Sequence, residues 1–198
     1  MERDALSAVI VAAGMSSRMN AFKPLLPLGE STMIRTLIGT CIAAGVGRIV
    51  VVTGHRADEL EAHVADLPVE CLRNPDYETT KMARSVRIGF DAVVGRCERV
   101  LFCPADMPLW RPSTVRALVE SGSLLAKPTY RGQNGHPLLI DASLIDPVLE
   151  RLDAEGLSAA VKATGIPMAF IEVDDPGCVL DADTPDQYAR LCSMSQQG

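Results

Sequence analysis

The chain has 198 residues, 47% of them hydrophobic, which predicts one globular domain with a full core over residues 1–198. Its formal net charge of −6 argues against a basic face for nucleic acid, although a small basic pocket is compatible with it. No run of about 18 apolar residues is present, and the first residues lack a signal-peptide pattern. The six cysteines include no Cys-x-x-Cys pair, which suits buried free thiols. We therefore expect a cytoplasmic protein without nucleic-acid or membrane partners.

The first half of the chain alternates apolar runs with segments of helical periodicity. The apolar runs predict strands at about 7–12, 48–53, 69–72 and 99–103, and the periodic segments predict helices at about 33–44, 57–65 and 82–94. Ser31 is the expected N-cap of the first helix, which Gly45 ends. This order predicts a three-layer α/β/α fold with a Rossmann-like, mostly parallel sheet and right-handed crossovers.

The second half of the chain is less regular. Helices are predicted at about 113–120, 144–151 and 157–164, and strands at about 124–128, 136–140 and 169–173. The polar, glycine-bearing link over 130–135 is typical of a hairpin-like loop. Thr184 to Gln187 has the form of a capping box with proline at the first helical position, which predicts a last helix reaching about residue 194.

The strands of the first half predict where a ligand binds. In a parallel, doubly wound sheet, ligands bind beyond the carboxyl ends of the strands, so the segments that follow those ends should converge on one crevice. The segments are Ala13-Gly14, Gly54-His55, Asn74 and Pro104-Ala105-Asp106. This expectation depends on the order of the elements alone.

The loop after the first strand has the features of a phosphate site. Ala12, Ala13 and Gly14 are small enough for a ligand to approach the backbone, Gly14 can adopt a positive φ, and free N–H groups of such a turn bind phosphate oxygens. Arg18 and Lys23 would neutralise a triphosphate. The G-x-G-x-x-G and Gly-Lys-Ser/Thr patterns are missing, and an ordinary loop with solvated cations is the alternative. The residues thus predict a nucleoside triphosphate site.

Carboxylates that follow apolar segments are the candidate metal ligands. Asp106 comes directly after a buried strand, and Asp181 and Asp183 face one side if their segment is extended. Hard oxygen donors suit Mg²⁺. The alternatives are that Asp106 starts a turn before Pro108, and that Asp183 only begins the helix with Thr184.

The string A-A-G-x-S-x-R-M-x-x-x-K-x-L-L-P-L-G, from Ala12 to Gly29, resembles the signature of the molybdenum cofactor nucleotidyltransferases. Its A-A-G form is similar to the cytidylyltransferase branch of that family, and Asn20 departs from the glycine usual at its position. The resemblance implies a nucleotide-diphospho-sugar transferase-like fold and Mg²⁺, with Mn²⁺ as the alternative metal. It implies CTP and a phosphorylated pterin acceptor, molybdopterin or its molybdenum form, as substrates, and transient docking to a molybdoenzyme or its chaperone.

The resemblance also implies a role for each matched residue. Arg18, Lys23 and Asp106 are expected to be catalytic, with Lys23 on the triphosphate and Arg18 on the leaving pyrophosphate. Metal contacts are expected from Asp106 and from the segment that holds Asp181 and Asp183, where Asp181 is slightly favoured although the sequence does not separate the two. The predicted nucleotide site comprises the first loop, the strand ends and the third helix: Ala12, Ala13, Gly14, Arg18, Lys23, Gly54, Asn74, Ser85 and Asp106.

The acceptor side is less well determined. His136, in Gly135-His136-Pro137, is the candidate for binding the pterin phosphate, and a structural role is its alternative. Lys81 and the segment 155–157 depart from the family pattern. Residues up to about 110 are expected to bind the NTP, and residues from about 111 to bind the acceptor. A sugar- or alcohol-phosphate nucleotidyltransferase and a non-catalytic nucleotide-binding or cofactor-delivery module remain open.

Overall fold

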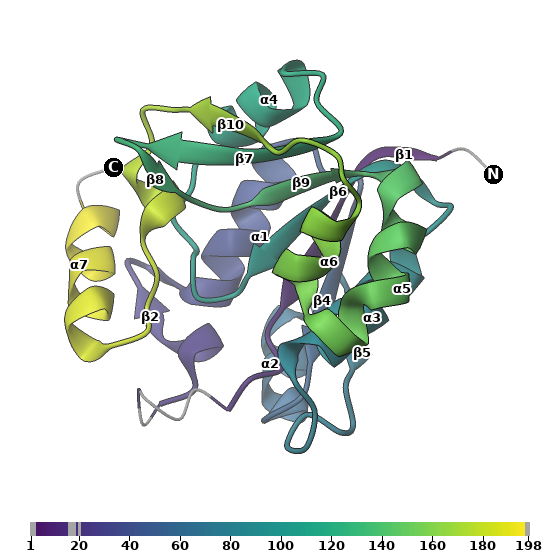
Figure 1. The fold of residues 1–198 in the computed structure, drawn as a ribbon. Helices are drawn as coiled ribbons and strands as arrows, with labels where there is room; N and C mark the ends of the chain where they lie inside the picture. Colours follow the sequence, from purple (N-terminus) through teal and green to yellow (C-terminus); the bar gives the residue numbers. More distant parts are fainter. Residues whose placement is uncertain (1–2, 16–18, 20, 197–198) are drawn as a thin grey trace.

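The computed structural model describes residues 3–15, 19 and 21–196. The main sheet is eight-stranded (Figure 1), and its strands are β1 (Asp4–Val11), β4 (Arg48–Thr53), β5 (Glu70–Arg73), β6 (Cys97–Pro104), β7 (Leu125–Tyr130), β8 (Gln133–Asn134), β9 (Leu138–Asp141) and β10 (Ala169–Glu172). The helices are α1 (Met33–Ala43), α2 (Ala57–Val64), α3 (Met82–Val93), α4 (Pro112–Glu120), α5 (Ile145–Glu155), α6 (Leu157–Ala163) and α7 (Pro185–Ser195). A small hairpin, β2 (Pro27–Leu28) with β3 (Ser31–Thr32), lies apart from the sheet.

The strand order is β10-β7-β9-β6-β1-β4-β5, with β8 paired to β7. β1 is parallel to both β4 and β6, and β5 is parallel to β4, as the alternating first half predicts. β9 is antiparallel to β6 and to β7, so the sheet is mixed but mostly parallel. This confirms the predicted fold class.

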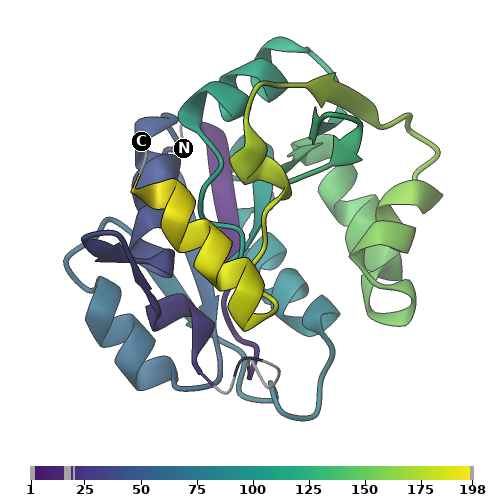
Figure 2. The same cartoon turned by 90° about the vertical axis from the view of Figure 1, so that its left-hand side faces the viewer.

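Helices cover both faces of the sheet because successive residues of each strand point to opposite sides. In β1, Ala8 and Ile10 pack in the core that also includes α1, α2 and α4. Val9 packs in the other core, with α3, α5 and α6. Figure 2, turned by 90° from Figure 1, shows α7 lying outside these layers, across the segment that includes β2 and β3. A hydrogen bond from the Tyr188 hydroxyl to the Pro27 carbonyl joins the two.

Most predicted elements are found within two residues of their predicted ends, but the local details differ at three places. Ser31 belongs to β3, and Thr32 holds the N-cap position of α1. The hairpin-like loop is a β7–β8 hairpin whose turn has positive φ at Arg131 (50°) and Gly132 (76°). The Thr184 hydroxyl accepts from the Gln187 N–H, but the Gln187 side chain donates to Asp181, so only half of the capping box forms.

The six cysteines are all free thiols, and four of them are buried, as the sequence predicts. Within the ranges that the structure describes, no helix is long and apolar enough to cross a membrane.

Candidate active site

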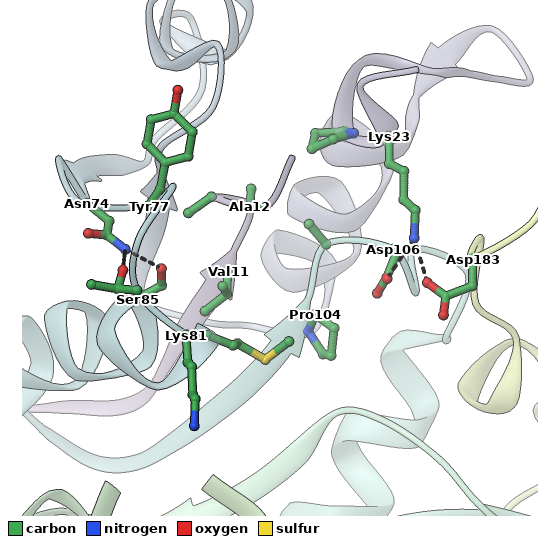
Figure 3. Close-up of a pocket in the computed structure, with 16 residues that line it drawn as sticks. Val11, Ala12, Lys23, Asn74, Tyr77, Lys81, Ser85, Pro104, Asp106 and Asp183 are labelled. Atoms are coloured by element: carbon green, nitrogen blue, oxygen red, sulfur yellow. Dashed lines mark hydrogen bonds and ion pairs between the residues drawn. The ribbon is translucent and has the colours of Figure 1, made fainter. Parts of the chain in front are cut away.

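A cavity of about 320 Å³ lies at the carboxyl ends of β1, β5 and β6 (Figure 3). Three strand-end segments line it: 11–14 after β1, Asn74 after β5, and 104–106 after β6. Lys23 and Asp183 complete one side, although 160 positions separate them in the chain. Three of the four segments expected to converge therefore do so, whereas Gly54-His55, at the end of β4, lies outside the lining.

The predicted site residues fall into four groups. Those that line the cavity are Ala12, Ala13, Gly14, Lys23, Asn74, Ser85, Asp106 and Asp183. Gly54 and Asp181 lie outside its lining, and His136 lines a different cavity. Arg18 lies outside the described residues.

Lys23 is the centre of the polar side of the cavity. Its Nζ lies 3.3 Å from Asp106 Oδ2 and 2.6 Å from Asp183 Oδ1, and its side chain is only 11% exposed. The main chain brings the two carboxylates together, because the Ala182 N–H donates to the Asp106 carbonyl over 3.0 Å. The first loop, the end of β6 and the segment before α7 thus meet at one ammonium group.

The carboxylates suit a hard divalent cation. Burial, and then the negative charges of Asp183 and Asp106, raise the pKa of Asp181. Among the described residues, no group of three His, Cys, Asp or Glu side chains is already arranged around a metal position. Instead, Lys23 lies between two carboxylates, those of Asp106 and Asp183. The slight preference for Asp181 over Asp183 is not supported, because Asp183 is the one that contacts Lys23 and lines the cavity. The donors present are carboxylate oxygens, which fit Mg²⁺ or Mn²⁺.

Asn74 lies in the wall of the cavity opposite Lys23 (Figure 3). Its Nδ2 donates to Ser85 Oγ (3.0 Å) and to Thr80 Oγ1 (3.2 Å), and its Oδ1 accepts from the Asp76 N–H (3.1 Å). Only 2% of Asn74 is exposed, so its polar atoms are engaged within the protein. Asn74 therefore makes the turn that the Asn-Pro pair predicts and ties the loop after β5 to the start of α3.

The two glycines of the predicted nucleotide site differ in what they allow. Gly14 does not have a positive φ, so the left-handed conformation expected there is not used. A Cβ at Gly14 would meet no atom of the described residues within 4 Å. A Cβ at Gly54 would lie 2.8 Å from Tyr77 Cβ and 2.9 Å from Ala13 Cβ. Gly54 therefore lets two wall segments approach each other closely.

Gly54→Ala is expected to destabilise the protein by about 1–3 kcal/mol, because the added methyl group must push Ala13 and Tyr77 apart. The free energy of unfolding, measured in denaturant, tests this. Gly14→Ala is the matched control, since its methyl group enters open space, and it should stay within about 0.5 kcal/mol of the parent. Equal stabilities of the two variants would contradict the close approach at Gly54.

A second cavity of about 450 Å³ adjoins the first, and Lys81 and Met82 line both. His136 lies in its wall, with its ring edge-on to Phe102 at 5.9 Å between centroids. Burial, and then the positive charge of Lys127, lower the pKa of His136 to about 4. His136 is therefore neutral at neutral pH and offers hydrogen bonds without a charge.

The depressed pKa of His136 predicts a loss of stability in acid. The unfolded chain binds the proton near pH 6.5 and the folded protein only near pH 4, so the free energy of unfolding falls as the pH decreases through this window. The loss attributable to this group is at most about 3 kcal/mol. His136→Gln should show a shallower decline between pH 7 and pH 4 in denaturant titrations. Parallel pH profiles for the variant and the parent would refute the shift.

Sequence reasoning did not single out three residues that line the cavities. Tyr77 and Thr80 lie in the loop between β5 and α3. The length of this loop was the only sequence feature that could have indicated its contribution to the site. Lys127 lies in β7, between the buried residues Ala126 and Pro128. Their positions become evident only from the packing of the loops and strands.

Comparisons with known proteins identify the family of the chain. The family "MobA-like NTP transferase domain" matches residues 8–167. The molybdenum cofactor cytidylyltransferase of Escherichia coli K12 is 30% identical over 93% of this chain and 94% of its own. A nucleotidyl transferase from Methanothermobacter thermautotroptrophicus superimposes with a TM-score of 0.84 at 27% identity, covering 98% of both chains. Rv0371c of Mycobacterium tuberculosis H37Rv, solved in complex with manganese, gives 0.81 at 23% identity over 98% of this chain and 100% of its own. The chain therefore belongs to the MobA-like NTP transferase family of nucleotidyltransferases.

Proposed function

We propose that the protein transfers the nucleoside monophosphate of CTP to the phosphate of molybdopterin or its molybdenum form, with release of pyrophosphate. The observation that carries this proposal is the meeting of Lys23, Asp106 and Asp183 in one cavity that adjoins a second cavity of about 450 Å³. Membership of the family and the 30% identity to a molybdenum cofactor cytidylyltransferase support it.

The substrates supply the reacting groups, so the chain needs no nucleophile of its own. An acceptor phosphate oxygen attacks the α-phosphorus in line, a new P–O bond forms, and the bond to the β-phosphate oxygen breaks. Alignment of the two reactants by the adjoining cavities contributes up to about 7–11 kcal/mol. Lys23, with Arg18 as the resemblance implies, neutralises the charge that develops on the leaving pyrophosphate.

The carboxylates would hold Mg²⁺, or Mn²⁺, the metal with which one structural neighbour was solved. Asp106 and Asp183 are the proposed ligands, and Asp181 lies beside them with its Oδ1 hydrogen-bonded to Gln187. When bound, such an ion supplies positive charge to the phosphate oxygens. Before substrate binds, the Lys23 ammonium neutralises the same carboxylates. A triphosphate competes with them for this ammonium group.

The small residues after β1 bear on the choice of base. Ala12 and Ala13 are almost fully buried and line the nucleotide cavity, where their methyl groups reduce its width against a purine. Ala13→Gly should therefore raise turnover with GTP relative to CTP. An unchanged GTP-to-CTP ratio in this variant would remove the idea while leaving nucleotidyl transfer intact.

A sugar- or alcohol-phosphate acceptor is the second candidate. The segment 153–158, which departs from the family pattern at 155–157, lines the second cavity and so lies where an acceptor would be selected. Both halves of the chain contribute to this cavity, since Lys81 and Phe102 line it together with Lys127 and His136. A non-catalytic nucleotide-binding or delivery module is disfavoured, because Lys23, Asp106 and Asp183 are all present and in contact.

The deciding experiment is a matrix of four NTPs with Mg²⁺ against molybdopterin, a sugar phosphate and a polyol phosphate, followed by pyrophosphate release. We expect release with CTP and molybdopterin, and little with either reactant alone. Release only with a sugar or polyol phosphate would replace the proposed acceptor. NTP binding without release under any combination would favour the non-catalytic module.

A further inference from the structure

The second cavity contains a lysine that the mechanism above does not use. Lys127 is half-buried in β7 and, two positions after Leu125, faces the same side of the sheet. Leu125 belongs to the apolar core under α3, α5 and α6. Beside Lys127 in the cavity lining, Phe102 of β6 pairs with Leu138 of β9. Burial of a lysine among such apolar residues costs free energy, because an ammonium group that loses contact with water needs a charged or hydrogen-bonding partner.

Lys127 has no such partner among the described residues. Its Nζ makes no hydrogen bond or ion pair there, and burial lowers its pKa without any acidic neighbour to raise it. The acidic residues of the same cavity are already paired. Asp153 accepts from Arg87 over 2.8 Å, and Glu155 accepts from Arg151 over 3.3 Å. At Lys127 the cavity therefore presents a positive charge that no described carboxylate compensates, over an apolar floor.

A second polar group at this site is also unpartnered within the described part of the chain. The Nδ1 atom of His136 is buried without a hydrogen-bond partner, and Lys127 is close enough to its ring to lower the pKa. Lys81, by contrast, lines both cavities, and Figure 3 shows its side chain pointing away from the pair formed by Lys23 and Asp106. Lys81 marks the junction of the cavities, whereas Lys127 lines the second cavity only.

We propose that Lys127 determines acceptor specificity by binding a second anionic group of the acceptor. This group is separate from the phosphate that reacts near Lys81, where the two cavities meet. The enzyme then favours acceptors with two anionic groups over those with one phosphate. This inference rests on the proposed function, because only a nucleotidyl transfer reaction has an acceptor. A charge-assisted hydrogen bond in a partly buried site is about twice as strong as a neutral one, so one lysine suffices to discriminate.

The test compares Lys127→Met with Lys127→Arg, and uses Lys162→Met on the exposed side of α6 as the matched control. Two probes are titrated: hydroxymethylpterin phosphate, with one anionic group, and molybdopterin, with a phosphate and a dithiolate. We expect Lys127→Met to raise the Kd for molybdopterin at least about tenfold. It should change the Kd for hydroxymethylpterin phosphate less than about twofold, and Lys127→Arg should restore part of the loss. The control should resemble the parent with both probes.

Two further measurements separate this inference from folding and from the proposed function. Removal of an unpaired, half-buried charge should leave the melting temperature equal to or above that of the parent, and the thermal shift with CTP and Mg²⁺ should not change. An unaltered molybdopterin Kd in Lys127→Met, or an equal loss for both probes, overturns the inference even if the parent releases pyrophosphate. If Lys127→Met selectively loses affinity for molybdopterin but the parent protein transfers no nucleotide, the anion site at Lys127 is supported and the proposed function is refuted.

Discussion

Replacement of Lys23 by methionine is expected to lower kcat/KM for the NTP by about 10²–10³-fold, the usual cost of losing one preorganised charge-stabilising donor. Methionine keeps the length of the buried stem but removes the ammonium that lies between Asp106 and Asp183. Pyrophosphate release under saturating acceptor measures the effect. The thermal shift produced by CTP and Mg²⁺ should shrink as well, because a triphosphate contact is lost.

The same variant has a second expected effect, on cation binding without nucleotide. The two carboxylates are about one third exposed, so loss of their counter-ion should cost only about 1 kcal/mol of stability. Without the competing ammonium, Mg²⁺ alone should stabilise Lys23→Met more than it stabilises the parent. Lys162→Met again serves as the control. A nucleotide affinity like that of the parent, or an unchanged response to Mg²⁺, would show that Lys23 is only a structural counter-ion.

Asp106→Asn is expected to retain the fold and to lose at least about tenfold in turnover, equivalent to about 1.4 kcal/mol. The substitution keeps the shape of the side chain and the backbone carbonyl that accepts from Ala182, but removes the charge near Lys23. Asp183→Asn should behave similarly, because Asp183 makes the shorter contact with Lys23. Steady-state rates at several Mg²⁺ concentrations provide the measurement.

Two further variants test whether the loss of turnover is specific to Asp106 and Asp183. Asp181→Asn should be milder than either variant, because Asp181 accepts from Gln187 and does not line the nucleotide cavity. Asp186→Asn, on the exposed first turn of α7, removes an equal charge outside the site and should leave the rate unchanged. Wild-type turnover by Asp106→Asn would refute its assignment as a metal ligand, and a larger loss in Asp181→Asn would reverse the order that the geometry indicates.

Local patterns of the sequence predict most of the first half, for a physical reason. A strand buried on both faces, such as 48–53, must be a continuous apolar run, and the helices between such strands need apolar residues at helical spacing. Once the order of elements is known, the parallel arrangement follows, because crossovers are right-handed and strand ends converge. The meeting of Asn74 and Asp106 in one cavity could therefore be predicted.

The tertiary structure decided matters that depend on contacts between distant segments. The choice between Asp181 and Asp183 follows from the path of the chain into α7, which turns Asp183 to Lys23 and Asp181 to Gln187. Sequence spacing cannot show this, because both residues share one side of an extended segment. The burial of Asn74 against Ser85 was equally hidden, since an Asn-Pro pair predicts a turn whatever packs upon it.

The sequence by itself determined the fold class, the family and three of the strand-end segments that form the nucleotide cavity, because local patterning and a long motif encode them. Only the tertiary structure placed Lys23 between two carboxylates and left Lys127 without a counter-ion among the described residues around the second cavity. Charge pairing and desolvation depend on which groups meet in space, and those neighbours are set by packing rather than by position along the chain.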